Sequence, residues 1–126
     1  VGVALTDQID PDSGGLTVYP GSHVTVINAY RDRVANGQRI FDLDASPDRP
    51  LFFNGTYVAL RPGDAVFVHC KTAHKVGTRR LPGNRFQLYW RLSHSDRERA
   101  VQDGSVLTDI FQGFDGLRRA CAVRAD

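Results

Sequence analysis

The stretch that decides the fold of this chain is residues 63–92, GDAVFVHCKTAHKVGTRRLPGNRFQLYWRL. It predicts a turn at residues 63–64 and then a strand over residues 65–70. A tight turn carrying His74 follows, and a polar loop then reverses the chain into a strand that begins at Arg85. Short strands joined by Gly/Pro turns are typical of an all-β sandwich or barrel of jelly-roll type.

The strand after the loop is predicted to have two unlike faces, because side chains alternate along a strand. One face is apolar and consists of Phe86, Leu88, Trp90 and Leu92. The other is polar and consists of Arg85, Gln87, Tyr89 and Arg91. Two arginines on one face are unusual for a plain core, so this face either meets water or lines a polar cavity.

His74 and Arg85 are the candidate functional pair. They lie on either side of a hairpin-like reversal, so both side chains can point into one cavity. A neutral imidazole is a good iron ligand, and a guanidinium can bind a carboxylate with two hydrogen bonds. Spacing alone also allows a plain alternative, with a surface histidine near a loop and an arginine on a solvated strand face.

The stretch resembles the C-terminal metal-and-cosubstrate motif of the phytanoyl-CoA dioxygenase family of non-haem Fe(II), 2-oxoglutarate-dependent oxygenases. That motif has an apolar strand after a Gly-Asp turn, a distal histidine ligand and an arginine on the next strand. Here these parts are residues 63–69, His74 and Arg85. A second block, residues 3–7 (VALTD) and 12–23 (DSGGLTVYPGSH), is similar to another segment of the family. The resemblance covers roughly residues 1–92.

The resemblance implies a double-stranded β-helix (jelly roll), incomplete in this chain, with short helices in an insertion and at the C-terminus. It implies part of a dioxygenase that hydroxylates a small organic substrate. His74 would then be a metal ligand for Fe(II), and Arg85 would bind the cosubstrate 2-oxoglutarate. No catalytic residue is expected beyond the metal centre, since the metal carries the difficult chemistry.

Four further residues are weaker candidates for the substrate cavity: His69, Gln87, Tyr89 and His23. His69 ends an apolar strand and is expected to be a cavity neighbour rather than a ligand. His23 follows a Pro-Gly turn, a position where histidine is commonly structural. The acidic turn over residues 7–15 either binds a cation or, more commonly, caps and solvates a loop.

The chain departs from the family pattern in one respect. The family needs a His-x-Asp/Glu pair ahead of the strand at residues 1–6, and two imidazoles with one carboxylate then hold Fe(II). The only His-x-Asp here is residues 94–96, which comes after Arg85 and is interpreted as a helix start. Since the chain begins within a strand, we expect a natural protein that extends upstream and a fragment that is inactive alone.

The remaining segments give weaker predictions. A short helix or an irregular insertion is expected near residues 28–35, extended chain over 39–43, and a loop over 46–50. A hairpin is expected between residues 51–53 and 57–60 around Asn54-Gly55. Weak candidates for binding an acidic substrate group are Arg31, Arg33 and Arg39. Residues 1–92 are predicted to be the core, and residues 93–126 a helical tail that packs on its outside.

Composition bounds the function. The chain has 126 residues, enough for one domain, and its 41% hydrophobic and 24% charged content is ordinary for a soluble globular protein. A net charge of +2 does not argue for nucleic acid.

No apolar run approaches the ~20 residues of a membrane span. Two cysteines, Cys70 and Cys121, are too few for a disulfide framework and favour the cytoplasm or another reducing compartment. The expected partner is a small-molecule substrate, not nucleic acid or a membrane.

Two other classes of function stay open. One is a non-catalytic jelly-roll domain whose polar strand face binds an acidic or sugar ligand without iron. The other is a degenerate oxygenase relative that lacks the full metal triad and serves as an interaction module. A His-x-Asp encoded upstream of Val1 would favour the enzyme.

Overall fold

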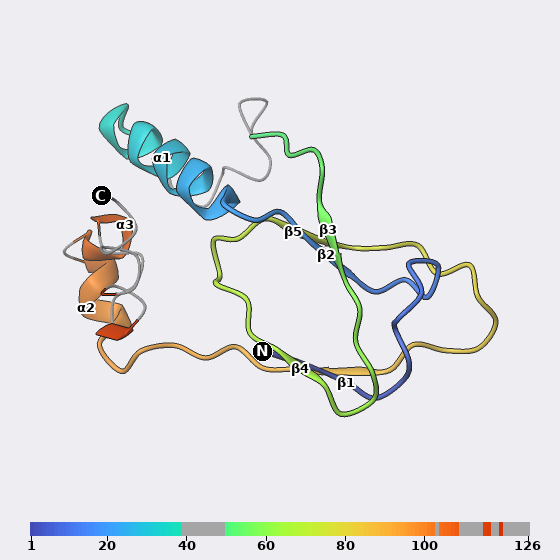
Figure 1. Cartoon of the computed structure of the whole chain (residues 1–126). Coiled ribbons are helices and arrows are strands. Elements are labelled where there is room, and N and C mark those ends of the chain that lie inside the picture. The colour runs from blue at the N-terminus through green and yellow to red at the C-terminus, as the bar shows by residue number, and fades with distance from the viewer. Residues whose placement is uncertain (39–49, 103, 109–114, 117–118, 120–126) are drawn as a thin grey trace. The chain divides into compact units, whose positions relative to one another are not determined.

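The computed structural model describes residues 1–38, 50–102, 104–108, 115–116 and 119, and its chain divides into two compact units, residues 1–91 and 92–126 (Figure 1). Each unit is described by itself below. Several predictions lie outside the described residues: the extended chain at 39–43, Arg39, Cys121, and all but Pro50 of the loop at 46–50.

The first unit contains two antiparallel three-stranded sheets. The first has the order β4-β1-β6, made of Ala65–Val66, Gly2–Ala4 and Gln87–Tyr89. The second has the order β3-β2-β5, made of Thr56–Val58, Leu16–Val18 and His74–Val76. Two antiparallel sheets accompanied by few and short helices confirm the predicted all-β class.

In each sheet, the strand that comes first in the sequence is the central strand. In the first sheet Gly2 of β1 lies opposite both Val66 of β4 and Tyr89 of β6. In the second sheet Leu16 of β2 lies opposite both Val58 of β3 and Val76 of β5. Central strands are buried by both neighbours, and β1 and β2 accordingly supply the core residues Ala4 and Leu16, which are 0% and 6% exposed.

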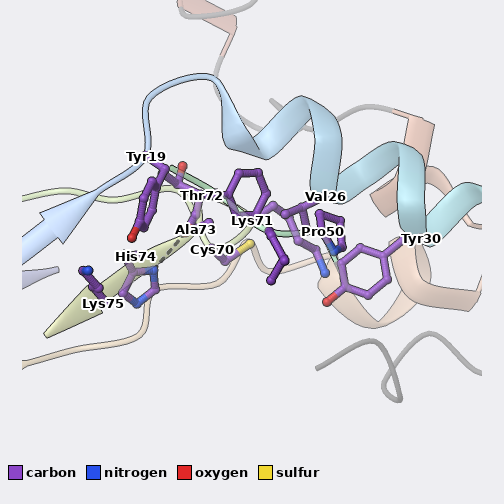
Figure 2. Close-up of a pocket in the computed structure, with 12 residues that line it drawn as sticks. Tyr19, Val26, Tyr30, Pro50, Cys70, Lys71, Thr72, Ala73, His74 and Lys75 are labelled. Carbon is purple, nitrogen blue, oxygen red and sulfur yellow. Dashed lines mark hydrogen bonds between the residues drawn. The ribbon is translucent and has the colours of Figure 1, made fainter. Parts of the chain in front are cut away.

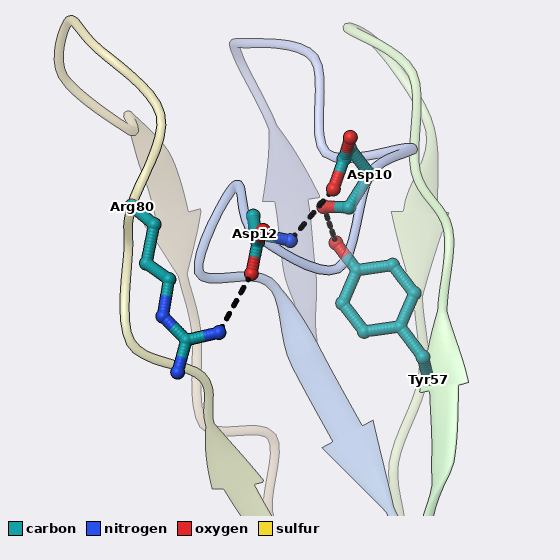
Figure 3. Close-up of polar contacts among 4 residues, drawn as sticks. All are labelled: Asp10, Asp12, Tyr57 and Arg80. Atoms are coloured by element: carbon teal, nitrogen blue, oxygen red, sulfur yellow. Dashed lines mark hydrogen bonds and ion pairs between the residues drawn. The ribbon is translucent and has the colours of Figure 1, made fainter.

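The acidic turn that joins β1 to β2 is held by its own carboxylates. Asp7 Oδ1 accepts a hydrogen bond from the Ile9 N–H at 2.9 Å, and Asp10 Oδ1 accepts one from the Asp12 N–H at 2.8 Å. Asp12 also forms an exposed ion pair with Arg80 at 3.1 Å (Figure 3). These carboxylates cap turns and contact solvent. Of the two alternatives predicted for the turn, cation binding and capping of a solvated loop, this is the commoner one.

Tyr57 of β3 connects this turn to the second sheet through hydrogen bonds. Its hydroxyl lies 2.8 Å from the Asp10 carbonyl oxygen, as Figure 3 shows. It also lies 2.7 Å from the Gln8 carbonyl oxygen and 2.9 Å from Ser13 Oγ. Gly15 is needed for this approach, because a Cβ there would lie 2.9 Å from Tyr57 Cζ. Gly15 thus leaves room for the phenol of a strand that is distant in sequence.

Helix α1 spans Ser22–Ala35 and begins earlier than the predicted helix at residues 28–35. Gly21, just before it, has a φ of 80°. This left-handed conformation ends the extended chain after β2 and lets the helix begin at once, at Ser22. This start was not predicted, because the Pro-Gly pair was interpreted as the turn that ends the preceding strand.

Two strand predictions are wrong in detail. The strand predicted over residues 65–70 ends at Val66. Residues 51–53 form no strand, and β3 pairs with β2 instead of forming a hairpin with them. Leu51 and Phe53 are 70% and 79% exposed, so this segment has no buried face that would stabilise a hairpin.

The second unit contains α2 (Arg97–Gln102) and α3 (Ser105–Thr108). Before α2, the Asp96 N–H donates to His94 Nδ1 at 3.1 Å, and the Asp96 carbonyl accepts from the Ala100 N–H at 3.0 Å. The His-x-Asp triplet therefore lies at a helix start. Packing of this unit on the β core stays a prediction. Within the residues that the structure describes, every helix is too short or too polar to cross a membrane.

Candidate functional site

His74 is the first residue of β5, and its backbone is fixed from two sides. It lies opposite Val18 of β2. The preceding residue, Ala73, accepts a hydrogen bond from the Tyr19 N–H at 3.0 Å and donates its own N–H to Ser22 Oγ at 2.8 Å. His74 was predicted to lie in a tight turn after a strand. This prediction is wrong, because β2 pairs with residues 74–76 as a strand. Ser22 is only 4% exposed, so the segment leading into His74 is anchored to buried structure.

The imidazole of His74 is oriented by a backbone carbonyl. Its Nδ1 lies 2.8 Å from the Thr72 carbonyl oxygen, shown as the dashed line in Figure 2. A carbonyl oxygen only accepts hydrogen bonds, so Nδ1 carries the proton and the lone pair of the neutral ring is on Nε2. Metal-binding histidines commonly have this arrangement, with the second ring nitrogen fixed by a carbonyl.

Arg85 lies two residues before β6 and begins a row of hydrogen-bonded polar side chains. Its Nη1 donates to Gln87 Oε1 at 2.5 Å and lies 3.4 Å from Tyr89 Oη. The row lies over β1, since a Cβ added to Gly2 would be 2.6 Å from Gln87 Nε2. Arg85 and Gln87 are half-buried, whereas Tyr89 is 60% exposed.

The apolar face of the same strand also meets solvent. Phe86, Leu88 and Trp90 are 56%, 45% and 49% exposed. Arg85 and Gln87 on the opposite face are more enclosed, so the polar row is not a freely solvated surface. The strand thus departs from the usual pattern in which the apolar face of a strand is buried.

His74 and Arg85 belong to different sheets. His74 is in β5 of the β3-β2-β5 sheet, and Arg85 leads into β6 of the β4-β1-β6 sheet. The predicted hairpin-like reversal between them is therefore wrong, because β5 and β6 each pair with a different central strand. That both side chains face one interior space stays a prediction.

The segment that joins β5 to β6 is held by Arg79. Its Nε donates to the Gly83 carbonyl at 2.7 Å, Nη2 to the Pro82 carbonyl at 2.6 Å, and Nη1 to the Ser13 carbonyl at 2.9 Å. One guanidinium thus closes the loop on itself and attaches it to the acidic turn. The segment between His74 and Arg85 is therefore a fixed connection.

A pocket of about 480 Å³ lies beside His74 (Figure 2). Helix α1, the end of β2, residues 50–52 and residues 70–75 line it. Its aromatic and basic lining residues are Tyr19, Tyr30, Phe52, Lys71, His74 and Lys75. A volume of this size is within the range of small-molecule sites.

His23 and His69 lie close to each other. Their ring centroids are 6.3 Å apart in an edge-on arrangement, and both residues are half-buried. His69 Nδ1 accepts a hydrogen bond from the Lys71 N–H at 3.2 Å. In the part of the chain that the structure describes, no group of three or more His, Cys, Asp or Glu residues could hold a metal ion. His23, His69 and His74 therefore do not form a ligand set among themselves.

Sequence reasoning missed three residues that shape this site: Ser22, Arg79 and Lys75. Ser22 and Arg79 act on backbone groups of residues remote in sequence, and no motif reveals such partners. A signal for Lys75 did exist, since Lys71 and Lys75 are the only lysines of the chain and flank the candidate histidine.

Comparison with known families gives one finding. A family model described as Phytanoyl-CoA dioxygenase (PhyH) matches residues 1–85. The match runs through β1 to β5 and ends at Arg85, so it includes both members of the candidate pair. Comparisons with curated proteins and with solved structures return no match.

Proposed function

Because this chain belongs to the phytanoyl-CoA dioxygenase (PhyH) family, a jelly-roll family of oxygenases, we propose that it is part of an Fe(II)- and 2-oxoglutarate-dependent dioxygenase. Its substrate is a small organic molecule that becomes hydroxylated. The observation that carries the proposal is the family match over residues 1–85, together with the carbonyl-anchored imidazole that lies inside the matched region.

His74 is proposed as an iron ligand through Nε2. Its Nδ1 is occupied by the Thr72 carbonyl, which directs the lone pair of Nε2 away from the backbone. The hydrogen bonds of Ser22 and Tyr19 to Ala73 hold the preceding peptide in place. Iron, when bound, supplies the activation of oxygen, and the chain supplies the position of its ligands.

Arg85 is proposed to bind the carboxylate of 2-oxoglutarate that is remote from the keto group. A half-buried guanidinium offers paired N–H donors to a carboxylate, and reduced contact with water strengthens this pairing. Gln87 Oε1 already orients Nη1 of Arg85, and Tyr89 Oη lies near the same nitrogen. Gln87 and Tyr89 are therefore proposed to keep the guanidinium in position.

The described residues supply one ligand of the set that a facial triad requires. Two imidazoles and one carboxylate hold Fe(II) in such a site, whereas no group of three suitable side chains occurs among residues that the structure describes. These residues alone do not fit a complete iron site. The proposal therefore requires a His-x-Asp/Glu pair from other residues.

The experiment measures succinate released from 2-oxoglutarate in the presence of Fe(II). The chain alone is expected to give no turnover, because its ligand set is incomplete. A chimera in which the N-terminal half of an active family member, with its His-x-Asp/Glu pair, is joined to residues 1–126 is expected to turn over 2-oxoglutarate. Turnover by the chain alone would contradict this account of the metal site.

Two substitutions in the active chimera test the named roles. His74→Ala is expected to abolish iron-dependent turnover. Arg85→Ala is expected to raise the 2-oxoglutarate concentration for half-maximal rate at least tenfold, the scale of one lost charge-assisted hydrogen bond at ~1.5–3 kcal/mol. Arg91→Ala is the control, since Arg91 is an exposed arginine just beyond β6. An active His74→Ala chimera would refute the ligand assignment.

A second candidate function is a ligand-binding domain that works without metal. The pocket beside His74 favours it, because described residues of α1, β5 and the segment after β2 line a cavity of small-molecule size there. A measurement of ligand binding with a chelator present distinguishes the two functions. The chelator removes iron but leaves a metal-free binding site intact.

A further inference from the structure

We propose that Arg85 binds carboxylates by exchange. In the ligand-free protein the side-chain amide of Gln87 is bound to the guanidinium, and a carboxylate ligand displaces this amide. The identification of the ligand as 2-oxoglutarate rests on the proposed function. The exchange itself involves only described residues of this chain and requires no metal. Gln87 would then position Arg85 only while no ligand is bound.

Arg85 is a half-buried cation without a carboxylate partner in the part of the chain that the structure describes. Its Nη1 donates to Gln87 Oε1 at 2.5 Å and lies 3.4 Å from Tyr89 Oη, whereas Nε and Nη2 make no hydrogen bond to any described residue. Arg80, by comparison, is paired with Asp12. A guanidinium that is partly removed from water and lacks a counter-charge favours an anionic ligand, and its planar N–H pairs suit a carboxylate.

The amide of Gln87 has a defined orientation. A guanidinium only donates hydrogen bonds, so the atom of Gln87 that faces Nη1 of Arg85 is the oxygen Oε1. The nitrogen Nε2 lies over β1, since a Cβ added to Gly2 would be 2.6 Å from it. The same added Cβ would lie 3.4 Å from Tyr89 Cε1 and 3.5 Å from Val66 Cγ1. The NH₂ group thus lies over a glycine and near apolar atoms.

The NH₂ group of Gln87 has no acceptor in this position. Nε2 is buried and makes no hydrogen bond to any residue that the structure describes. A buried donor without an acceptor is costly, because it has lost its hydrogen bonds to water. The contact of Oε1 with Arg85 therefore holds the amide in a place that is unfavourable for its other end.

A carboxylate ligand is favoured in the exchange for two reasons. Its charged oxygens accept hydrogen bonds from a guanidinium more strongly than a neutral amide oxygen does, and it can bind two N–H groups at once. The released amide of Gln87 can also turn away from Gly2 and donate from Nε2 to water or to the ligand. Binding of the carboxylate thus relieves the unpaired donor.

The test uses the whole chain with a chelator and without iron, so that it does not depend on oxygenase activity. The probes are glutarate, a dicarboxylate without a keto group, and its neutral diamide glutaramide. Binding is followed by NMR titration of the isotopically labelled chain, in which the side-chain NH₂ signals of Gln87 are assigned by their absence in Gln87→Met. Glutarate should shift these signals with the same midpoint as the backbone amide of Arg85, and glutaramide should leave them unchanged.

Two variants that take the amide away from Arg85 are expected to strengthen binding. Gln87→Met replaces the amide with an apolar side chain of similar length. It should tighten glutarate binding about threefold, the scale of one neutral hydrogen bond that no longer competes, and should raise the midpoint of urea unfolding because the unpaired donor is gone. Gly2→Ala keeps the amide but places a Cβ where Nε2 lies, so that the amide must move, and it should tighten binding likewise.

Two further variants are the controls. Arg85→Met should abolish the shifts that glutarate causes, because it removes the binding cation. Gln38→Met is the matched control for the loss of a glutamine amide, since Gln38 is exposed and belongs to the same unit. It should change neither the affinity for glutarate nor the unfolding midpoint.

Three results would overturn the proposal. Weaker or unchanged glutarate binding in Gln87→Met would show that the amide does not compete for Arg85. Glutarate binding that leaves the NH₂ signals of Gln87 unshifted would show that the amide stays in place. Failure of glutarate to bind in an Arg85-dependent manner would show that the chain has no such site.

The exchange and the oxygenase function can fail separately. Displacement of the Gln87 amide by glutarate, without turnover by the chimera described above, would leave the carboxylate site standing and remove only the oxygenase function. Turnover by the chimera, together with weaker glutarate binding in Gln87→Met, would support the oxygenase and overturn the exchange.

Discussion

The hydroxyl of Tyr57 shows how a single atom can join two parts of this fold. It contacts the carbonyl oxygens of Gln8 and Asp10 and the hydroxyl of Ser13, all in the turn between β1 and β2. The phenol has one proton for two carbonyls, so the proton is shared between them while the Ser13 hydroxyl can donate to the phenol oxygen. Loss of this oxygen would leave the turn without its link to β3.

Tyr57→Phe is expected to lower the free energy of unfolding by about 1–2 kcal/mol, because partly buried acceptors lose their donor. Tyr89→Phe is the matched control and should change it by less than about 0.5 kcal/mol, since Tyr89 is 60% exposed and its contact to Arg85 is 3.4 Å long. Urea unfolding followed by the fluorescence of Trp90, the only tryptophan, gives both values. Equal values for the two variants would show that the Tyr57 contacts do not stabilise the protein.

For single residues, the sequence revealed some of the side chains that matter for the candidate site and the fold. His74 and Arg85 could be chosen because a family motif specifies their types and order. Tyr57, Ser22 and Arg79 could not be chosen, because each acts on backbone groups that come near only after folding. A motif records residue types along the chain and does not show which carbonyl lies opposite.

The loop over residues 77–84 is one of the segments that join the two sheets. Arg79 closes it through the carbonyls of Pro82 and Gly83 and attaches it to Ser13. The neighbouring Arg80 makes a different contact, an ion pair with Asp12 in which both side chains are largely exposed. The two adjacent arginines are therefore unequal in what they contribute.

Arg79→Leu is expected to lower the unfolding free energy by about 2 kcal/mol, because three carbonyls lose a charged donor. Arg80→Leu should cost no more than about 1 kcal/mol, as is usual for an exposed ion pair. Hydrogen exchange should locate the difference, with faster exchange at residues 77–84 in the Arg79 variant only. Similar exchange in the two variants would argue against a loop organised by Arg79.

For the elements, the sequence predicted where strands lie better than how they pair. Residues 57–60 were expected to be a strand, and β3 spans Thr56–Val58. Its predicted partner at 51–53 is wrong, because local turn signals favour a hairpin whereas burial against β2 decides the pairing. Alternation also described the two faces of β6, but it did not reveal that Arg85 and Gln87 on the polar face are more enclosed than the apolar residues Phe86 and Leu88.

Viewed as a whole, the first unit carries an exposed apolar surface on the β4-β1-β6 sheet. Leu5, Phe67, Phe86, Leu88 and Trp90 are between 45% and 75% exposed. Ala65 and Leu88 both lie opposite Val3, so these residues are on one face of the sheet. Apolar residues two positions further along each strand are on the same face. Contiguous apolar surface of this kind binds apolar dyes and retards a protein on hydrophobic media.

Phe67→Ser/Phe86→Ser is expected to lower the fluorescence of bound anilinonaphthalene sulfonate and to shorten retention on a phenyl column. The unfolding free energy should change by only about 0.5 kcal/mol, because both side chains are already exposed. Leu60→Ser is the contrast, since Leu60 is 5% exposed and its loss should cost about 2 kcal/mol or more. Undiminished dye binding in the double variant would show that the dye binds elsewhere.

The positions of β1 and β2 at the centres of their sheets have a consequence for synthesis on the ribosome. The partners of β1 are β4 and β6, which are translated long after it. At the usual ~5–20 residues per second, the nascent β1 waits several seconds with both edges unpaired. Chaperones that shield extended segments would act in this interval, and slowing translation would lengthen it.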